Sequence, residues 1–540
     1  MKMRLSVTGT MVPLIVFTLL SCACVKEMRP NHMMSSPRIA GETQVKALLG
    51  ARDQGLVVPA VVVPKVESEP GVPLRLSLRE AVLSGLEHNE SFRVERLKPT
   101  ISRTAEEVER AAFDPQLTAQ GSHTHGQDGR TGTTQLSTST IGTRQSNDAE
   151  STLLGLGLTQ ATPLGATVEL NADQERVTDD ELATHGKQQN WDLTVTQSLL
   201  RGRGPGVNLV RLRQSRLDTE ISLYELQGAA EALVAQIEKG YWDLVLADRS
   251  LVIYQHSLTI AQAQVAEVNE RIKVGALAEN EAAAAEAEAA LRHQQLIAAQ
   301  GTVAKARLNL LRFVNPAGLA DWAAQVKLTD TPEGEGMAVD QVENHVAVAL
   351  SKRPDLNQAR LQVRRQDLEV VRTRNGLLPK LDLFLSLGGS RFTDSFAGQE
   401  EQLTKQHAYA GGLTLELPLA NRAAKARHAA AGWSLDQARA ALANMEQLVQ
   451  VDVRSAHVDV EQFVAQVKAA TATLLLREKT HALELEKFRL GRSTTLSVAQ
   501  AQRDLLASQL ALAEAVVGVR KAFLDLYRLE GSLLAHRGIE

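Results

Sequence analysis

The side chains of this sequence that could carry out chemistry are few and stand far apart. His123 and His125 form a His-x-His pair, which binds transition metals when a strand presents both rings on one face. No cysteine or carboxylate cluster stands beside them, so solvent-facing histidines without a metal are the favoured interpretation. Residues 202–206, Gly-Arg-Gly-Pro-Gly, are superficially like a phosphate loop. They lack the Lys-Ser/Thr pair and contain proline, which favours a turn between a strand and a helix.

No catalytic motif accompanies these residues. Gly-x-Ser-x-Gly and His-Glu-x-x-His do not occur in the sequence, and no cysteine follows Cys24 to act as a nucleophile. The charged stretch at 279–288 has the pattern of a solvated helix face. The sequence therefore predicts neither an enzyme nor a bound cofactor or metal.

The first residues have the pattern of an export signal. Lys2 and Arg4 precede an apolar run at 11–20, which is too short to span a bilayer stably. The run closes with Leu-Leu-Ser-Cys at 19–22, which resembles a bacterial lipobox and predicts lipidation of Cys22. An ordinary signal peptide that happens to contain cysteine is the alternative. We therefore expect a signal peptide at 1–21 and an extended, proline-containing tether at 22–73.

The composition narrows the class of protein. The 540 residues carry 59 Lys and Arg against 63 Asp and Glu, a net charge of -4, which excludes a nucleic-acid protein that depends on bulk positive charge. Two cysteines exclude a disulfide scaffold. Aromatic residues make up only 4% of the chain, which indicates helix seams packed by small residues rather than bulky compact cores.

A tandem duplication organises the sequence. Residues 89–92 align with 353–356, and 113–117 with 377–381, both 264 positions later. After the strands the offset falls to 220 and then to 216, so the first copy has about 44 extra residues in its strand region. The predicted domains follow from this: a first repeat at 74–314, a linker at 315–339, a second repeat at 340–534 and a tail at 535–540.

Each repeat predicts one very long helix, at 209–273 and at 422–490, with Asn208 as the first N-cap and Gly275 as the first C-cap. Apolar or small residues alternate in steps of four and three along both helices, which is a heptad seam and indicates coiled-coil packing. At about 1.5 Å per residue these helices are about 100 Å long. The shorter helices, at 78–112 and 276–312, are about half that length, so two stacked end to end match one long helix.

The predicted strands lie at the opposite end from the glycine turns. They are 117–123, 152–159, 167–171 and 192–198 in the first repeat, and 381–387 and 412–417 in the second. Apolar residues alternate with small or polar ones, which fits a barrel with lipid outside and a wet lumen. A two-sheet domain on a helical stalk gives the same alternation and stays open as an alternative.

Taken together, these features resemble the TolC-like outer-membrane efflux proteins, in the form of an outer membrane factor lipoprotein. The resemblance rests on the order and spacing of Leu-Ser-Leu-Arg-Glu-Ala at 76–81, Pro115 and Pro379, Arg-Pro-Asp-Leu at 353–356, and the glycine turns. It implies a mainly α fold with a β-barrel portion, in which a homotrimer shares one α-barrel and one outer-membrane β-barrel. Typical members contribute four strands per subunit, whereas six are predicted here, and whether the extra pair joins the barrel is left open.

The resemblance also implies sites and partners. The tips at Val274, Gly275, Leu490 and Gly491 are expected to meet a periplasmic membrane-fusion adaptor, with an inner-membrane pump or ABC transporter behind it. A glycine C-cap between two helices needs no partner, so this contact rests on the resemblance alone. Glu281 lines the periplasmic aperture in one interpretation and is a solvated N-terminal carboxylate in the other. Ser497 holds the matching position in the second repeat.

The expected function is therefore a lipid-anchored outer-membrane exit duct that extends into the periplasm and serves tripartite efflux or type I secretion. The alternative is a periplasmic coiled-coil adaptor or scaffold lipoprotein without a pore. The sequence does not identify the transported substrate.

Overall fold

A computed structural model describes residues 74–136, 139–179, 184–314, 322, 325–331, 340–396 and 402–539, all of which belong to one compact unit, residues 51–540. The predictions for the signal peptide, Cys22 and the tether lie outside the described residues, as does most of the predicted linker, of which 322 and 325–331 are described.

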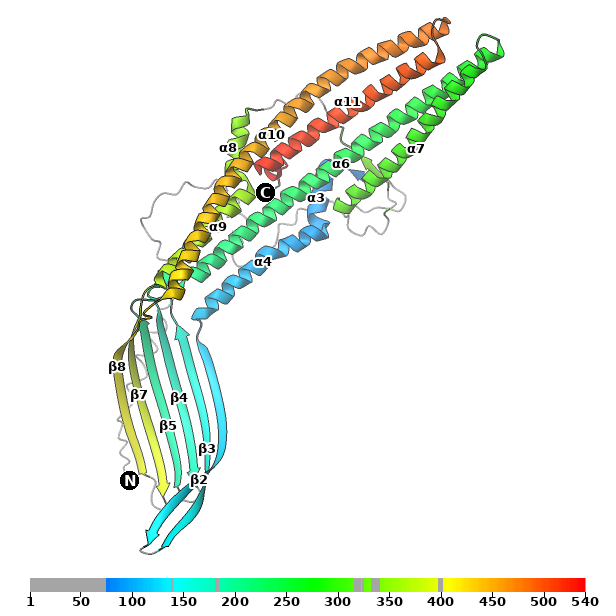
Figure 1. The fold of residues 1–540 in the computed structure, drawn as a ribbon. Coiled ribbons are helices and arrows are strands. Elements are labelled where there is room, and N and C mark those ends of the chain that lie inside the picture. The colour runs from blue at the N-terminus through cyan, green and yellow to red at the C-terminus, as the bar shows by residue number, and fades with distance from the viewer. Residues whose placement is uncertain are drawn as a thin grey trace, which may run out of the picture. The chain divides into compact units, whose positions relative to one another are not determined.

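Two helical hairpins dominate the described chain. In the first, α6 (Val210–Lys273) turns into α7 (Asn280–Val314); in the second, α10 (Arg422–Arg489) turns into α11 (Thr495–Glu530). Both turns lie at the end of the helices remote from the sheet (Figure 1). With 64 and 68 residues, α6 and α10 are each about 100 Å long, as predicted. None of the described helices has an apolar stretch long enough to cross a lipid bilayer.

The shorter stretch predicted as one helix at 78–112 is two helices, α3 (Leu78–His88) and α4 (Glu90–Arg110), followed by the 3-10 turn η1 (Ala111–Phe113). Asn89 causes the break, because its backbone is extended and its side-chain oxygen accepts the N–H of Phe92 at 3.1 Å. Its amide nitrogen also donates to the Phe313 carbonyl at 3.0 Å, which ties the break to α7. The second repeat breaks at the equivalent Arg353, between α8 (Val342–Lys352) and α9 (Pro354–Asn375).

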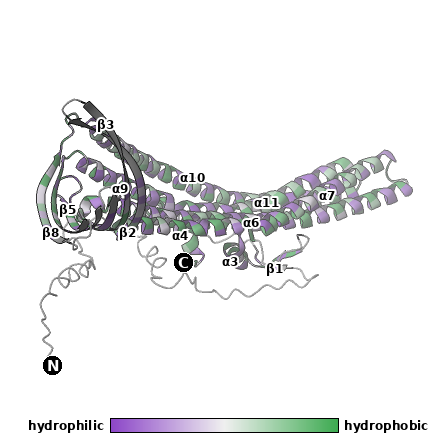
Figure 2. Cartoon of the chain, turned by 90° about the horizontal axis from the view of Figure 1, so that it is seen from below, coloured by the Kyte–Doolittle hydropathy of each residue, from purple (hydrophilic) through white to green (hydrophobic). Residues whose placement is uncertain are grey.

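One six-stranded antiparallel sheet contains all the predicted strands, in the order β2-β3-β4-β5-β7-β8. The extra pair therefore joins the same sheet. The strands are longer than predicted: β2 (Gln116–Leu136), β3 (Ser139–Ala161), β4 (Ala166–Asp179), β5 (Thr184–Ser198), β7 (Lys380–Phe396) and β8 (Gln402–Glu416). Figure 2 shows that the strands curve into an open arc.

The β2–β3 hairpin extends past the other strands. The last residue of β4, Asp179, pairs with Ala149 of β3. Beyond that point, residues 127–136 of β2 and 139–148 of β3 pair only with each other among the described residues. At about 3.3 Å per residue, this two-stranded ribbon continues for about 33 Å.

The turn between β5 and α6 differs in one detail from the sequence prediction. Residues 202–206 form a strand-to-helix turn, with Gly202 and Gly204 at φ 85° and 86°, and lead into the short helix α5 (Pro205–Asn208). Asn208 is not the N-cap of α6, because the residue before that helix is Leu209. The Asn208 side chain instead donates to the Pro163 and Gly202 carbonyls at 3.1 and 2.8 Å, which fastens this turn to the β3–β4 turn.

The largest core lies midway along the helices, where α6 and α11 meet α3 and the two-stranded parallel sheet of β1 (Leu74–Leu76) and β6 (Val326–Leu328). The buried Tyr241 hydroxyl donates to the Asp330 carboxylate at 2.9 Å and accepts the Asp330 N–H at 3.2 Å. The predicted tail begins inside α12 (Leu533–His536). Beyond it, Arg537 forms two 2.6 Å hydrogen bonds with the fully buried Glu238, which holds the C-terminal segment against α6.

Candidate functional site

The two helical tips share one backbone geometry. Gly275 has φ 73° and donates its N–H to the Ile272 carbonyl at 2.9 Å, while Ala276 donates to the Arg271 carbonyl at 2.8 Å. Gly491, at φ 70°, and the residue after it make the equivalent bonds of 3.0 and 2.8 Å at the end of α10. This pair of backbone hydrogen bonds is the Schellman motif. Glycine suits its left-handed position because it has no Cβ. The predicted C-cap at Gly275 is off by one residue, because the C-cap residues are Val274 and Leu490 and the left-handed glycines directly follow them.

The tips are apolar and open to their surroundings. Val274 and Leu490, each directly before a tip glycine, are 76% and 69% exposed. A Cβ built on either glycine meets no atom within 4 Å. The predicted tip residues Val274, Gly275, Leu490 and Gly491 thus form two similar exposed tips. Contact with another molecule there would require no repacking of this chain.

Glu281 lies in the first turn of α7, half-buried, with its N–H donated to the Ala278 carbonyl at 3.1 Å. Ser497, the matching residue, donates its N–H to the side chain of Thr494, which is the N-cap of α11. The two positions therefore differ in charge and in local bonding. Both lie in the first turn after a tip, where a carboxylate is favoured by the helix dipole.

A link between the two hairpins, which the sequence did not predict, lies directly behind the tips. The Arg271 guanidinium of α6 donates to the Phe488 carbonyl of α10 at 3.0 Å and lies 4.7 Å from the centre of the Phe488 ring. Glu267 holds the same guanidinium at 2.8 Å. Phe488 is buried with Val268 and Val498 in a small apolar core. One arginine therefore connects the end of α6 to the end of α10.

A second unpredicted link corrects the interpretation of residues 279–288 as a solvated face at one position, Glu288, whereas Glu279 and Glu286 are exposed. Glu288 is buried, and its carboxylate lies 2.5 Å from Arg292, which is also buried, and 3.5 Å from Arg503 of α11. A buried carboxylate needs such partners, because an unpaired charge is costly to remove from water. The spacing of Glu288 and Arg292 by four residues was the only signal in the sequence.

The sheet has one apolar face. The strand register places six residues in one row across it, each directly opposite the next: Leu117, Leu158, Leu170, Leu193, Leu387 and Tyr409. Neighbouring rows on the same face add Leu156 and Trp191 on one side and Leu385, Leu413 and Leu415 on the other. These five rows, from Leu381 to Gly389, cover about 26 Å along the strands. In the single chain the side chains of this face are largely exposed, Tyr409 at 91%.

The opposite face of the sheet is polar and acidic. Its rows contain Thr, Gln, Asn and Ser together with six carboxylates whose side chains the structure describes: Glu169, Asp173, Glu175, Asp192, Asp382 and Glu416. Lys380 also lies on this face, 3.3 Å from Asp382 and directly opposite Glu416. Thr194 donates to Ser386 across two strands at 3.0 Å, as expected of a wet surface. The two faces together match the alternation predicted for a sheet between lipid and water.

The remaining sequence candidates are accounted for by local bonds. His123 lies on β2, 3.0 Å from the Thr152 hydroxyl and 3.2 Å from the Glu150 carboxylate, and both it and His125 are exposed. Over the described ranges, no group of three or more His, Cys, Asp or Glu side chains is arranged to hold a metal ion.

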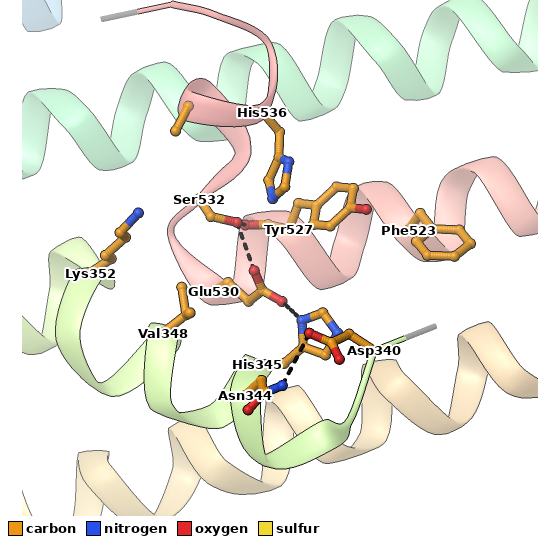
Figure 3. Close-up of a pocket in the computed structure, with 11 residues that line it drawn as sticks. Asp340, Asn344, His345, Val348, Lys352, Phe523, Tyr527, Glu530, Ser532 and His536 are labelled. Atoms are coloured by element: carbon orange, nitrogen blue, oxygen red, sulfur yellow. Dashed lines mark hydrogen bonds and ion pairs between the residues drawn. The ribbon is translucent and has the colours of Figure 1, made fainter. Parts of the chain in front are cut away.

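A polar cavity of about 460 Å³ lies between α8, α11 and the C-terminal segment (Figure 3). The buried Glu530 carboxylate accepts hydrogen bonds from His345 and from the Ser532 hydroxyl, the latter at 2.8 Å. The His536 ring stacks on Tyr527 at 4.1 Å between centroids. These contacts join α8 to the last turn of α11, and the cavity is far from both tips and sheet (Figure 1).

The fold and these surfaces agree with comparisons to known proteins. The family model described as outer membrane efflux protein matches residues 346–532. A comparison with curated protein sequences finds no relative of this chain.

Solved structures match over most of the chain. The CmeC outer membrane channel of Campylobacter jejuni is 15% identical over 84% of this chain and 86% of its own, with a TM-score of 0.61. A membrane protein from Pseudomonas aeruginosa is 20% identical over 84% and 93%, with a TM-score of 0.62. VceC of Vibrio cholerae is 15% identical over 85% and 96%, with a TM-score of 0.59. Residues 346–532 therefore match the outer membrane efflux protein model, and the chain has the fold of these solved channels, the TolC-like fold.

Proposed function

We propose that this protein is an outer-membrane exit duct, which passively conducts substrates delivered by an inner-membrane pump and a periplasmic adaptor. The observation that carries the proposal is the single sheet with one apolar and one acidic polar face, attached to helices about 100 Å long. The apolar face suits lipid and the polar face suits a water-filled lumen. The helices have the length needed to continue the lumen into the periplasm.

The edges of the sheet indicate how copies assemble. In the described chain, β2 and β8 are edge strands, whose unpaired backbone groups favour pairing with another chain. Because six is an even number, β8 of one copy runs antiparallel to β2 of the next, so head-to-tail copies can close into a ring with uniform antiparallel pairing. As in the family it resembles, we propose a homotrimer, and three copies of six strands supply 18.

The helices carry matching apolar stripes. Val94, Leu97, Ile101 and Val108 lie at heptad spacing along one face of α4 and are all more than half exposed. Leu448, Val451 and Val458 form a similar exposed stripe on α10. In the described chain α4, α6, α9 and α10 pack side by side in that order, so the two stripes belong to the outer helices of the layer. Contact between the α4 stripe of one copy and the α10 stripe of the next completes the wall.

The remaining parts of the proposal follow the family resemblance. Val274, Gly275, Leu490 and Gly491 would contact the adaptor, Glu281 would face the periplasmic aperture, and lipid on Cys22 would anchor the chain at the outer membrane. The two repeats would be residues 74–314 and 340–534, joined by the linker 315–339. Energy would come from the pump, which is either an efflux pump or an ABC transporter of type I secretion.

The test is assembly and conductance of the full-length protein. We expect detergent-purified protein to be a trimer by native mass spectrometry and to conduct ions in a planar bilayer. Because carboxylates outnumber cations on the polar face of the sheet, reversal potentials in a salt gradient should show preference for cations. A monomer without conductance would overturn the duct and support the adaptor or scaffold without a pore.

A further inference from the structure

Four cations lie together on the apolar face of the sheet, just past the last apolar row. Arg176 of β4 is directly opposite Lys187 of β5, and Arg391 of β7 is directly opposite Lys405 of β8. Gln189, two residues from Lys187, is in turn opposite Arg391, so the two pairs occupy neighbouring rows of one face. The cluster lies on the side of the apolar rows that is remote from the helices (Figure 1).

The cluster is electrostatically unfavourable in the isolated chain. Like charges directly opposite each other destabilise a sheet, and here two such pairs are adjacent. All four side chains are exposed, and none forms an ion pair with another residue in the part of the chain that the structure describes. Among the described side chains, this part of the face therefore presents four positive charges without an ion pair, while Glu150, in the row beyond Arg176, pairs with His123.

An apolar groove lies on the same face and the same strands. Its volume is about 360 Å³, and Leu193, Val195, Leu385, Leu387 and Tyr409 line it together with Ser386, Ala410 and Gly411. Leu387 is four residues from Arg391, and Tyr409 is four residues from Lys405, so about 13 Å separates the groove from the cations. A ligand that fits both features has an anionic head and an apolar tail.

We propose that this surface binds a lipid whose headgroup carries phosphate, with the phosphate at Arg176, Lys187, Arg391 and Lys405 and an acyl chain in the groove. Guanidinium and ammonium groups are the usual protein partners of phosphate. A soluble anion would leave the groove unused, and an acidic protein would have to enter the lipid-facing rows. The inference rests on the proposed function, which places this face in the membrane with the cations at the outer headgroup layer.

Native mass spectrometry of the full-length protein in detergent tests the proposal, with two probes: hexa-acylated lipid A carrying two phosphates, and the same lipid with both phosphates removed. We expect the phosphorylated lipid to bind at least about tenfold more tightly, a difference of about 1.4 kcal/mol. The R391Q/K405Q variant should lose most of this preference, and adding R176Q and K187Q should abolish it. The affinity should also fall as ionic strength rises.

The matched control is K305Q/K468Q, which removes the same charge from exposed positions of α7 and α10 and should bind as the unaltered protein does. Equal binding of both lipids, or unaltered binding by R391Q/K405Q, would overturn the proposal. Competition by millimolar inorganic phosphate would also overturn it, by indicating a site for a soluble anion. Trimer mass and conductance are measured on the same preparations, so a conducting trimer without lipid preference refutes this inference alone.

Discussion

At the scale of single residues, Glu231 on α6 shows what the packed helix layer imposes on a carboxyl group. The side chain is 3% exposed, and burial raises its pKa from 4.5 to about 7. Gln227, one turn earlier, donates a hydrogen bond at 3.4 Å, which offsets part of this effect. Near neutral pH this group is therefore divided between its protonated and ionised forms.

Replacing Glu231 by Gln removes this titration. Because folding raises the Glu231 pKa, the folded chain binds this proton more tightly than the unfolded chain does. The contribution of this group to the free energy of unfolding is therefore full below about pH 4.5 and is lost as the pH rises to about 7. Glutamine cannot ionise, so the variant should be more stable than the unaltered protein at pH 8, by up to about 3 kcal/mol, and about equally stable at pH 4. Denaturant unfolding in detergent at both pH values measures the difference.

Glu225→Gln is the matched control, because Glu225 is exposed on the same helix. It should leave the pH dependence of unfolding unaltered. An E231Q variant with the same pH dependence as the unaltered protein would show that Glu231 stays ionised and solvated when the chain folds.

At the scale of elements, the long helices were the most predictable part. Heptad seams run from Leu226 to Ile272 in α6 and from Val449 to Leu474 in α10. The glycines at 275 and 491 mark the helix ends, and both ranges were predicted to within one residue. The break at Asn89 was missed because its cause is partly tertiary: a hydrogen bond to Phe313, 224 residues away. The contacts of Glu288 with Arg503 and of Arg271 with Phe488 were missed for the same reason, since these partners lie on the other hairpin.

All six strands of the large sheet were predicted, but their predicted ranges were too short, because alternation is visible only where one face is apolar. Past the apolar rows both faces are polar, as at His123 and Arg176, and the strands continue through backbone pairing that no side-chain pattern reveals. The sequence also predicted the tip residues, since a glycine after a long helix has a local cause, the left-handed residue that directly follows the C-cap.

The tips give the second prediction, at Gly275→Arg and Gly491→Arg. A side chain at either position meets open space, so the cost is the left-handed backbone, about 1–2 kcal/mol, confined to the turn. Trimer assembly should therefore persist while export is lost, because bulk and charge now occupy the proposed adaptor contact. Export of a fluorescent substrate from cells and the oligomer mass of the purified variants give the two readouts.

Gly301→Arg serves as the control, since Gly301 is an open position of α7 away from the tips. It should export normally. If the tip variants instead failed to assemble, the two glycines would have a structural role in ending the helices and no part in docking.

At the scale of the whole molecule, the third prediction concerns the α4 stripe. Replacing Val94, Leu97 and Ile101 together by Ser should weaken the trimer without unfolding the chain, because these side chains are 61%, 56% and 65% exposed in the single chain. Burial of each is worth about 1–2 kcal/mol at an interface. Sedimentation in detergent over a range of concentrations should therefore show monomer where the unaltered protein is trimeric.

Val252→Ser is the control, because Val252 is similarly exposed but lies on α6, between the outer helices of the layer. It should sediment as a trimer. A triple variant that stays trimeric at every concentration would exclude the α4 stripe from the subunit contact.

The six-stranded sheet also sets the width of the duct in the proposed trimer. A strand tilted at about 40° occupies about 6 Å of circumference, so six occupy close to 40 Å. The four helices α4, α6, α9 and α10, at about 9–10 Å each, occupy about the same. Sheet and helix layer therefore fit each other without narrowing at their junction, which four strands per subunit would not achieve.

The position of the β2–β3 ribbon determines which described part of the chain a molecule or particle approaching the cell contacts first. In the proposed orientation it projects about 33 Å past the rest of the sheet, away from the periplasm, and three copies would stand around the mouth of the duct. Antibodies and bacteriophages approaching the bacterium would meet this ribbon before any other described part of the chain. It is therefore the described segment most open to such contacts, and because it pairs with no other described strand, sequence change there costs the duct least.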